Sequence, residues 1–84
     1  MNVIILQLYR GGIVGVKNKL LEIRLGLGYK KQKDFADYIG VSQASYNKWE
    51  NNSSQPGMET VLKISKKLKI KIEEIIYLEE ESKE

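Results

Sequence analysis

The stretch that decides the fold of this chain is residues 32–51, QKDFADYIGVSQASYNKWEN. Its small and apolar residues fall where two short helices could cross tightly. Ala36 would leave room for a crossing helix, and Gly40 could supply the positive φ that ends the first helix. Five larger apolar residues would fill the angle between the two helices: Phe35, Ile39, Val41, Tyr46 and Trp49.

This pattern predicts a helix-turn-helix, with a first helix over 32–39 and a second over 43–51 behind Ser42 as N-cap. An advance of 100° per residue places Tyr46 and Trp49 on the inner side of the second helix. Gln43 lies at the exposed N-terminal edge. The outward side carries Ala44, Asn47, Lys48 and Asn51.

The outward side of the second helix offers amide, methyl and ammonium groups and no carboxylate. Glutamine or asparagine can bond adenine bidentately, lysine can reach guanine acceptors, and alanine can touch a thymine methyl. The alternative is an ordinary solvated face of an amphipathic helix. We favour DNA binding because the chemistry of this side suits the major groove.

The composition of the chain limits what else it could do. Eighty-four residues make one small domain, which buries only about 60% of the surface of its unfolded form. The chain has no cysteine and no histidine, so disulfides, thiolate metal sites and histidine proton shuttles are excluded. We expect no enzymatic activity, no metal site and no cofactor.

Charge is distributed unevenly along the chain. Residues 17–71 hold twelve Lys and Arg against five Asp and Glu, whereas residues 72–84 hold one against six. Residues 17–71 thus carry a net charge of +7, and residues 72–84 carry −5. This distribution suits a polyanionic partner that binds on a surface away from the acidic C-terminal end.

The first sixteen residues are β-branched and punctuated by glycines, which predicts a strand followed by a turn. They lack the features of a signal peptide, and no span approaches the roughly 20 apolar residues of a membrane helix. We therefore expect a cytoplasmic protein with no membrane partner. One interpretation is an edge strand over 3–9 that pairs with a second subunit. The other is that the natural start lies later, at Val16, behind a ribosome-binding sequence encoding Arg10-Gly11-Gly12.

Helical periodicity begins at Lys17, and we expect the domain to span 17–78, after an N-terminal strand or disordered arm over 1–16. In the helix that begins at Lys17, before the helix-turn-helix, one face is shared by Leu20, Ile23 and Leu27. Residues 51–57 form a polar loop. Another helix then places Met58, Val61, Leu62, Ser65 and Leu68 inward. A short last helix over 72–76 would cap the core with Ile72, Ile75 and Ile76, before a frayed acidic tail over 79–84.

Residues 18–76 resemble the Cro and phage-repressor type of regulators, also called XRE-like. The resemblance depends on a set of residues at fixed spacing: Leu20, Ile23-Arg24, Gln32, Phe35-Ala36, Gly40-Val41-Ser42, Trp49-Glu50-Asn51 and Pro56. It implies an all-α, compact five-helix domain of the lambda-repressor type, here with a possible N-terminal β-strand. It also implies that the helix over 43–51 lies in the major groove of double-stranded DNA.

Site residues carried over from this resemblance fall into two groups. Base contacts would come from Gln43, Ala44, Asn47 and Lys48. Phosphate contacts would come from Gln32, Ser45, Asn51, Asn52 and Ser53. In the family the residue matching Gln32 also braces the start of the recognition helix, and the residues matching Arg24 and Glu50 often pair.

Two departures from the family pattern stand out. The turn 29–31 is one residue longer than usual, and Lys31 replaces a threonine N-cap, a loss worth about 1 kcal/mol. Lys30, Lys31 and Lys33 would instead strengthen phosphate binding at a helix N-terminus. Asn52 stands where glycine is usual, and asparagine tolerates the left-handed conformation.

The function expected from these observations is that of a transcription regulator, a repressor that binds its operator as a homodimer. The apolar end at 72–78 and the strand at 3–9 are the two candidate dimer contacts. The alternative is an antitoxin or a protein-interaction module that uses the same fold to bind a toxin or another protein partner.

Overall fold

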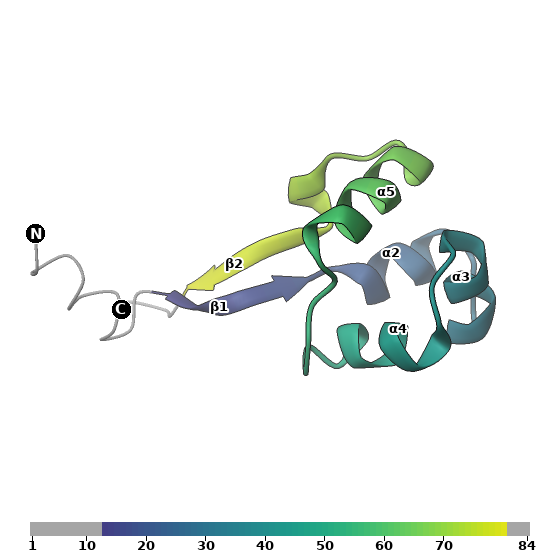
Figure 1. Ribbon diagram of the computed structural model, residues 1–84, viewed down its shortest axis with the longest axis horizontal. Coiled ribbons are helices and arrows are strands. Elements are labelled where there is room, and N and C mark those ends of the chain that lie inside the picture. Colours follow the sequence, from purple (N-terminus) through teal and green to yellow (C-terminus); the bar gives the residue numbers. More distant parts are fainter. Residues whose placement is uncertain (1–12, 81–84) are drawn as a thin grey trace, which may run out of the picture.

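The computed structural model describes residues 13–80, which form a helical globule with a two-stranded ribbon that projects from it (Figure 1). The α-helices within these residues are α2 (Leu20–Gly26), α3 (Gln32–Ile39), α4 (Gln43–Glu50) and α5 (Met58–Leu68). A short 3₁₀ helix, η2 (Ile72–Glu74), precedes the second strand. The strands β1 (Ile13–Asn18) and β2 (Ile76–Glu80) pair antiparallel.

The core lies where the helices meet, and aromatic side chains fill much of it. Tyr46 is fully buried and Trp49 is 8% exposed, which confirms the inward side predicted for α4. The ring of Tyr46 meets those of Phe35 and Trp49 edge to face, with centroids 5.5 Å and 6.3 Å away. The other core residues are Leu20, Ala36, Val61, Ile64 and Ile75.

The turn between α3 and α4 has the predicted geometry. Gly40 adopts φ +83°, and the backbone N–H groups of Gly40 and Val41 both donate to the carbonyl of Ala36 at 2.9 Å. The hydroxyl of Ser42 accepts from the backbone N–H of Ser45 at 3.1 Å, so Ser42 is the N-cap of α4. Lys31 makes no side-chain cap at the start of α3, as its chemistry predicted.

The two ends of the domain differ from the prediction. The strand β1 runs to Asn18, so the first helix begins at Leu20 instead of Lys17. The expected last helix over 72–76 is only the turn η2, and Ile76 already belongs to β2. Val16 pairs with Leu78 and Asn18 with Ile76. Such pairing between distant segments leaves no local signal in the sequence.

These strands also change the predicted organisation. The helical class is confirmed, and residues 13–80 form four α-helices and a two-stranded sheet in place of the five helices expected. The expected boundaries at 16/17 and 78/79 fall within β1 and β2, and residues 79–80 belong to β2 instead of a frayed tail. The expected strand over 3–9 lies outside the described residues.

Several side chains expected in the core face solvent instead. On α5, Met58 and Leu62 are 66% and 49% exposed, while Ile64 is buried. Val61, Ile64 and Leu68 form the stripe that faces the core, spaced at i, i+3 and i+7. Leu27 is exposed because α2 ends one residue before it.

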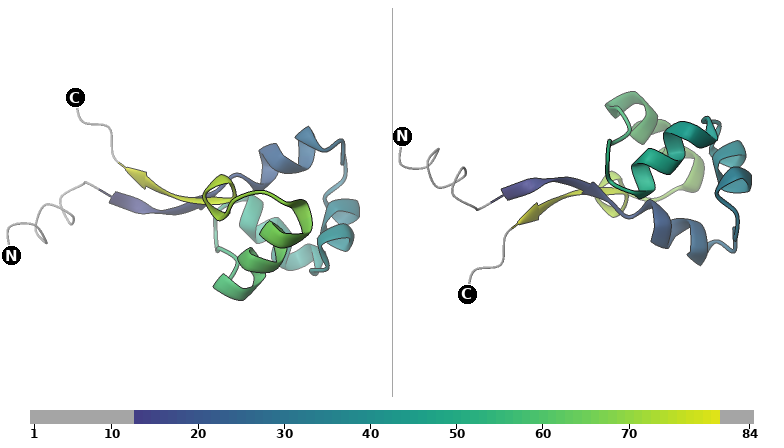
Figure 2. Two further views of the ribbon diagram at one scale, coloured as in Figure 1. Left: turned by 90° about the horizontal axis from the view of Figure 1, so that it is seen from above. Right: turned by 90° about the horizontal axis from the view of Figure 1, so that it is seen from below.

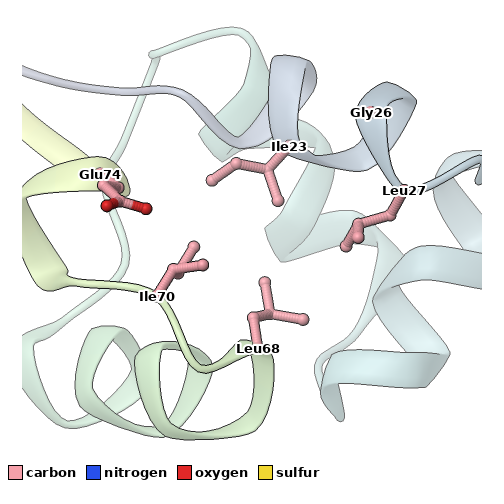
Figure 3. A pocket seen from close by; sticks show the side chains of 6 residues that line it. All are labelled: Ile23, Gly26, Leu27, Leu68, Ile70 and Glu74. Atoms are coloured by element: carbon pink, nitrogen blue, oxygen red, sulfur yellow. The ribbon is translucent and has the colours of Figure 1, made fainter.

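A small apolar pocket of about 280 Å³ lies between the C-terminal ends of α2 and α5 (Figure 3). Ile23, Leu27, Leu68 and Ile70 point toward it, and Glu74 lies at its side. Neither α3 nor α4 contributes a lining residue. Its apolar lining with one carboxylate does not suit a nucleic acid.

Candidate nucleic-acid interface

The helix α4 presents its polar side to solvent. Seen from below, it lies on the near side of the helical globule (Figure 2, right panel). All four side chains expected to read bases are exposed: Gln43, Ala44, Asn47 and Lys48. Because Tyr46 and Trp49 anchor the opposite side in the core, the helix cannot turn these residues inward without emptying the core.

The candidate phosphate-binding residues lie at the start of α3, on α4 and in the loop that follows α4. Lys31, Lys33, Ser45, Asn51 and Ser53 are exposed, whereas Gln32 and Asn52 are half-buried. The ammonium of Lys33 lies 3.1 Å from the carboxylate of Asp37 on the solvent side of α3. An exposed pair of this kind is worth less than about 1 kcal/mol, so Lys33 can exchange it for a phosphate.

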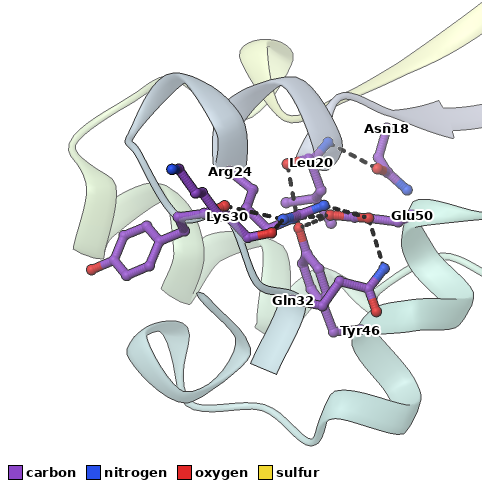
Figure 4. A network of polar contacts seen from close by, with 8 residues as sticks. Asn18, Leu20, Arg24, Lys30, Gln32, Tyr46 and Glu50 are labelled. Carbon is purple, nitrogen blue, oxygen red and sulfur yellow. Dashed lines mark hydrogen bonds and ion pairs between the residues drawn. The ribbon is translucent and has the colours of Figure 1, made fainter. Parts of the chain in front are cut away.

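Glu50, the acidic residue of α4, is held inside by a polar network (Figure 4). Arg24 donates from Nε to its Oε2 at 2.6 Å and from Nη2 to its Oε1 at 3.3 Å. The hydroxyl of Tyr46 donates to Oε2 at 2.5 Å, and Gln32 donates to Oε1 at 2.8 Å. The expected pair of Arg24 and Glu50 is confirmed, and it keeps this carboxylate off the outward side of α4.

The position of Gln32 differs in one respect from what the resemblance implied. Its amide braces the last residue of α4, Glu50, and not the start of that helix. The same network explains the longer turn before α3. Arg24 donates from Nη1 to the carbonyls of Tyr29 and Lys30 at 3.0 Å and 2.7 Å, which fixes the additional residue.

The network shifts the acid–base properties of its members. Burial raises the pKa of Glu50, but the hydrogen bonds from Arg24, Tyr46 and Gln32 together lower it by more. The pKa of Glu50 therefore lies below its usual range. The carboxylate of Glu50 raises the pKa of the Arg24 guanidinium. Burial, and then the hydrogen bond to Glu50, raise the pKa of the Tyr46 hydroxyl. The three groups therefore keep their ordinary charge states at neutral pH.

Asn18 is a buried polar residue that the sequence interpretation did not single out. It is 8% exposed, and its amide connects β1 to the end of α4 and to the loop behind it. Its Oδ1 also accepts from the backbone N–H of Leu20 at 3.0 Å. An asparagine two residues before a helix is the available signal, because asparagine commonly bonds the backbone two residues ahead. Asn52 adopts φ +59°, the left-handed conformation expected for it.

Two other features of residues 13–80 bear on function. No helix among them is long and apolar enough to cross a bilayer. Within the same residues, no three His, Cys, Asp or Glu side chains cluster so that they could hold a metal ion.

Comparison with known proteins identifies related sequences. The profile of the helix-turn-helix family matches residues 20–75. The transcriptional repressor RstR of the cryptic phage CTXphi from Vibrio cholerae is 38% identical over 60 residues, which cover 71% of this chain and 53% of the repressor. The chain thus spans about half the length of that relative. The uncharacterized HTH-type transcriptional regulator YgzD of Bacillus subtilis is 33% identical over 67 residues, covering 80% of this chain and all of YgzD. No solved structure gives a significant match.

Proposed function

Because the chain belongs to the helix-turn-helix family of DNA-binding transcription regulators, we propose that it is a repressor that reads a specific operator with α4. The observation that carries this proposal is the outward side of α4, which is exposed and free of carboxylates. Glu50, the acidic residue of this helix, is turned into the protein by Arg24. The proposed role is one of binding and not of catalysis, and we propose that the protein acts in the cytoplasm, where it meets its DNA.

Base reading in this proposal belongs to the first two turns of α4. The amides of Gln43 and Asn47 bond adenines, Lys48 reaches guanine acceptors, and Ala44 packs on a thymine methyl. Phosphates on either side are held by seven residues around the helix: Lys31, Gln32, Lys33, Ser45, Asn51, Asn52 and Ser53. Phosphate contacts set the orientation, and base contacts set the sequence.

We also propose that the protein binds its operator as a homodimer. A single helix reads only a few base pairs, whereas a two-fold dimer reads two half-sites about 34 Å apart. The expected apolar end at 72–78 is only partly available, since Ile75 is fully buried. Four exposed residues instead gather around a shallow depression of about 270 Å³ beside Ile76: Val16, Met58, Tyr77 and Leu78. None of them belongs to α3 or α4, so a contact here leaves the reading face open.

Selection of bound sequences from a random duplex DNA library tests the proposed function. We expect an enriched motif with two inverted half-sites, and an affinity that falls steeply as salt rises because several phosphates are contacted. Failure to enrich any motif would exclude a sequence-specific regulator. Retention of a protein partner at high salt, with no motif, would favour the antitoxin or protein-interaction alternative.

Sedimentation of the Leu78→Glu variant tests the dimer surface. A buried carboxylate at a dimer contact is costly, so we expect this variant to sediment as a monomer. Leu25→Glu is a matched control, because Leu25 is 55% exposed, Leu78 is 56% exposed, and Leu25 lies outside the patch. A dimer that survives Leu78→Glu, or one that Leu25→Glu also breaks, would rule out this surface.

A further inference from the structure

Asn18 occupies a junction between three parts of the molecule. It is the last residue of β1, and its side-chain Nδ2 donates to the carbonyl of Trp49 at 2.8 Å and to Oε1 of Gln55 at 2.7 Å. Its Oδ1 accepts from the backbone N–H of Leu20, at the start of α2. A buried amide that uses both of its ends in this way is fixed in orientation.

Backbone groups dictate which way this amide and its neighbours face. The carbonyl of Trp49 can only accept a hydrogen bond, so it must face the side-chain nitrogen of Asn18. The backbone N–H of Leu20 can only donate, so it must face the side-chain oxygen of Asn18. With its Oε1 turned to Asn18, Gln55 directs its Nε2 at Oδ1 of Asn52, 2.8 Å away. The backbone N–H of Asn18 approaches the same oxygen at 3.3 Å. The oxygen of Asn52 therefore faces inward.

The loop over 51–57 depends on this arrangement. Within residues 13–80, its other hydrogen bonds join it only to the adjoining helices, such as those from the N–H groups of Asn52 and Ser53 to carbonyls of α4. Asn18 supplies the hydrogen bonds that reach from the loop to a distant segment, 34 and 37 residues away in sequence. Asn18 thus fixes the position of the loop, and of Asn52 within it, relative to the rest of the domain.

We propose that Asn18 is a positioning residue for DNA binding, which orients Asn52 so that its Nδ2 donates to a backbone phosphate. This inference rests on the proposed function, because it needs DNA against the loop. A phosphate oxygen only accepts hydrogen bonds, so the loop must offer a donor. Within the described residues Nδ2 of Asn52 makes no hydrogen bond, while its oxygen is held inward. Asn18 reaches the DNA only through Asn52.

A double-mutant cycle in the full-length protein tests whether Asn18 acts on DNA through Asn52. The probes are a selected operator duplex and a random duplex. We expect Asn18→Ala and Asn52→Gly each to weaken binding at least about tenfold on both duplexes, as for one lost hydrogen bond to a charged group. Glycine is chosen because it keeps the left-handed backbone at position 52. The double variant should bind within about twofold of Asn52→Gly alone, since Asn18 acts through that residue.

The inference would be overturned, while the proposed function stands, if Asn18→Ala lowered DNA affinity equally in the wild type and in Asn52→Gly. It would also be overturned if Asn18→Ala lowered affinity in neither. A wild-type protein that binds no duplex DNA would overturn both. Gln55→Met is a second variant in case Asn18→Ala does not fold, because Gln55 is only half-buried and contacts the same oxygen of Asn52. It should lose affinity, and this loss should likewise vanish with Asn52→Gly.

A measurement without DNA separates positioning from general stability. ¹⁵N relaxation of the Asn52 side-chain amide should give an order parameter near the rigid value of about 0.85 in the wild type. In Asn18→Ala it should fall below about 0.6, while the backbone of α4 stays rigid. An Asn52 amide equally ordered in both proteins would contradict the proposal.

Discussion

The guanidinium of Arg24 and the carboxylate of Glu50 form an ion pair with an Nε–Oε2 distance of 2.6 Å and side chains only 8% and 6% exposed. The pair joins α2 to the last residue of α4. It therefore contributes to two properties at once: the angle at which α4 lies against the core, and the absence of a carboxylate from its polar outward side.

Removing one partner of this pair should be strongly destabilising. We expect Glu50→Gln to lower the free energy of unfolding by about 3 kcal/mol, because Arg24 then remains buried without its counter-charge. Urea denaturation measures this. Glu59→Gln is the control: Glu59 pairs with Lys63 at 3.4 Å in solvent and should change stability by less than about 0.5 kcal/mol. Equal effects of the two variants would refute a structural role for the buried pair.

Stability should also depend on pH through Glu50. Its pKa is lowered in the folded protein, so between that pKa and the unfolded value of about 4.3 the unfolded state binds more protons. The contribution of the carboxylate is thus complete above about pH 5 and is lost as pH falls through the folded pKa. Urea titrations from pH 7 to 2 should show the gap between wild type and Glu50→Gln narrowing over this range. A gap that stays constant would argue against it.

Two glycines should respond oppositely to alanine. An added Cβ meets no atom within 4 Å at either Gly40 or Gly26, so the backbone conformation decides. At Gly40, with φ +83°, Gly40→Ala should cost about 1 to 2 kcal/mol. Gly26 is helical, and Gly26→Ala should stabilise by about 0.5 to 1 kcal/mol. Thermal unfolding of both variants would decide, and a neutral Gly40→Ala would remove the requirement for glycine in the turn.

Base-reading and phosphate-binding residues should differ in what their loss does to binding. Gln43→Ala should relax preference at one position of each half-site, where a bidentate contact is worth about 1 to 3 kcal/mol of discrimination. Lys33→Ala should weaken all sequences alike and flatten the salt dependence. Affinities for a panel of single-base operator variants, taken at several salt concentrations, measure both. Identical profiles for the two variants would disprove this division of roles.

The sequence predicted the features that depend on residues close together in the chain better than those that depend on distant residues. The helices α3 and α4 occur where the pattern predicted them, because their signals are local: Gly40 at the turn, Ser42 as N-cap, and aromatic residues at helical spacing. The exposure of the four residues proposed to read bases also followed from this periodicity. By contrast, Met58 and Leu62 were placed inward wrongly, because periodicity alone does not show which side of α5 the rest of the protein covers.

The sequence by itself determined the helix-turn-helix, the inward side of α4 and the polar groups it turns outward, since all three arise from contacts between residues close in the chain. Only the tertiary structure decided that 13–18 and 76–80 form a ribbon, and that Asn18 is linked to the loop after α4. Strand pairing and hydrogen bonds between residues more than 30 positions apart depend on how the whole chain folds. The alternation or spacing of residues within one segment does not encode such contacts.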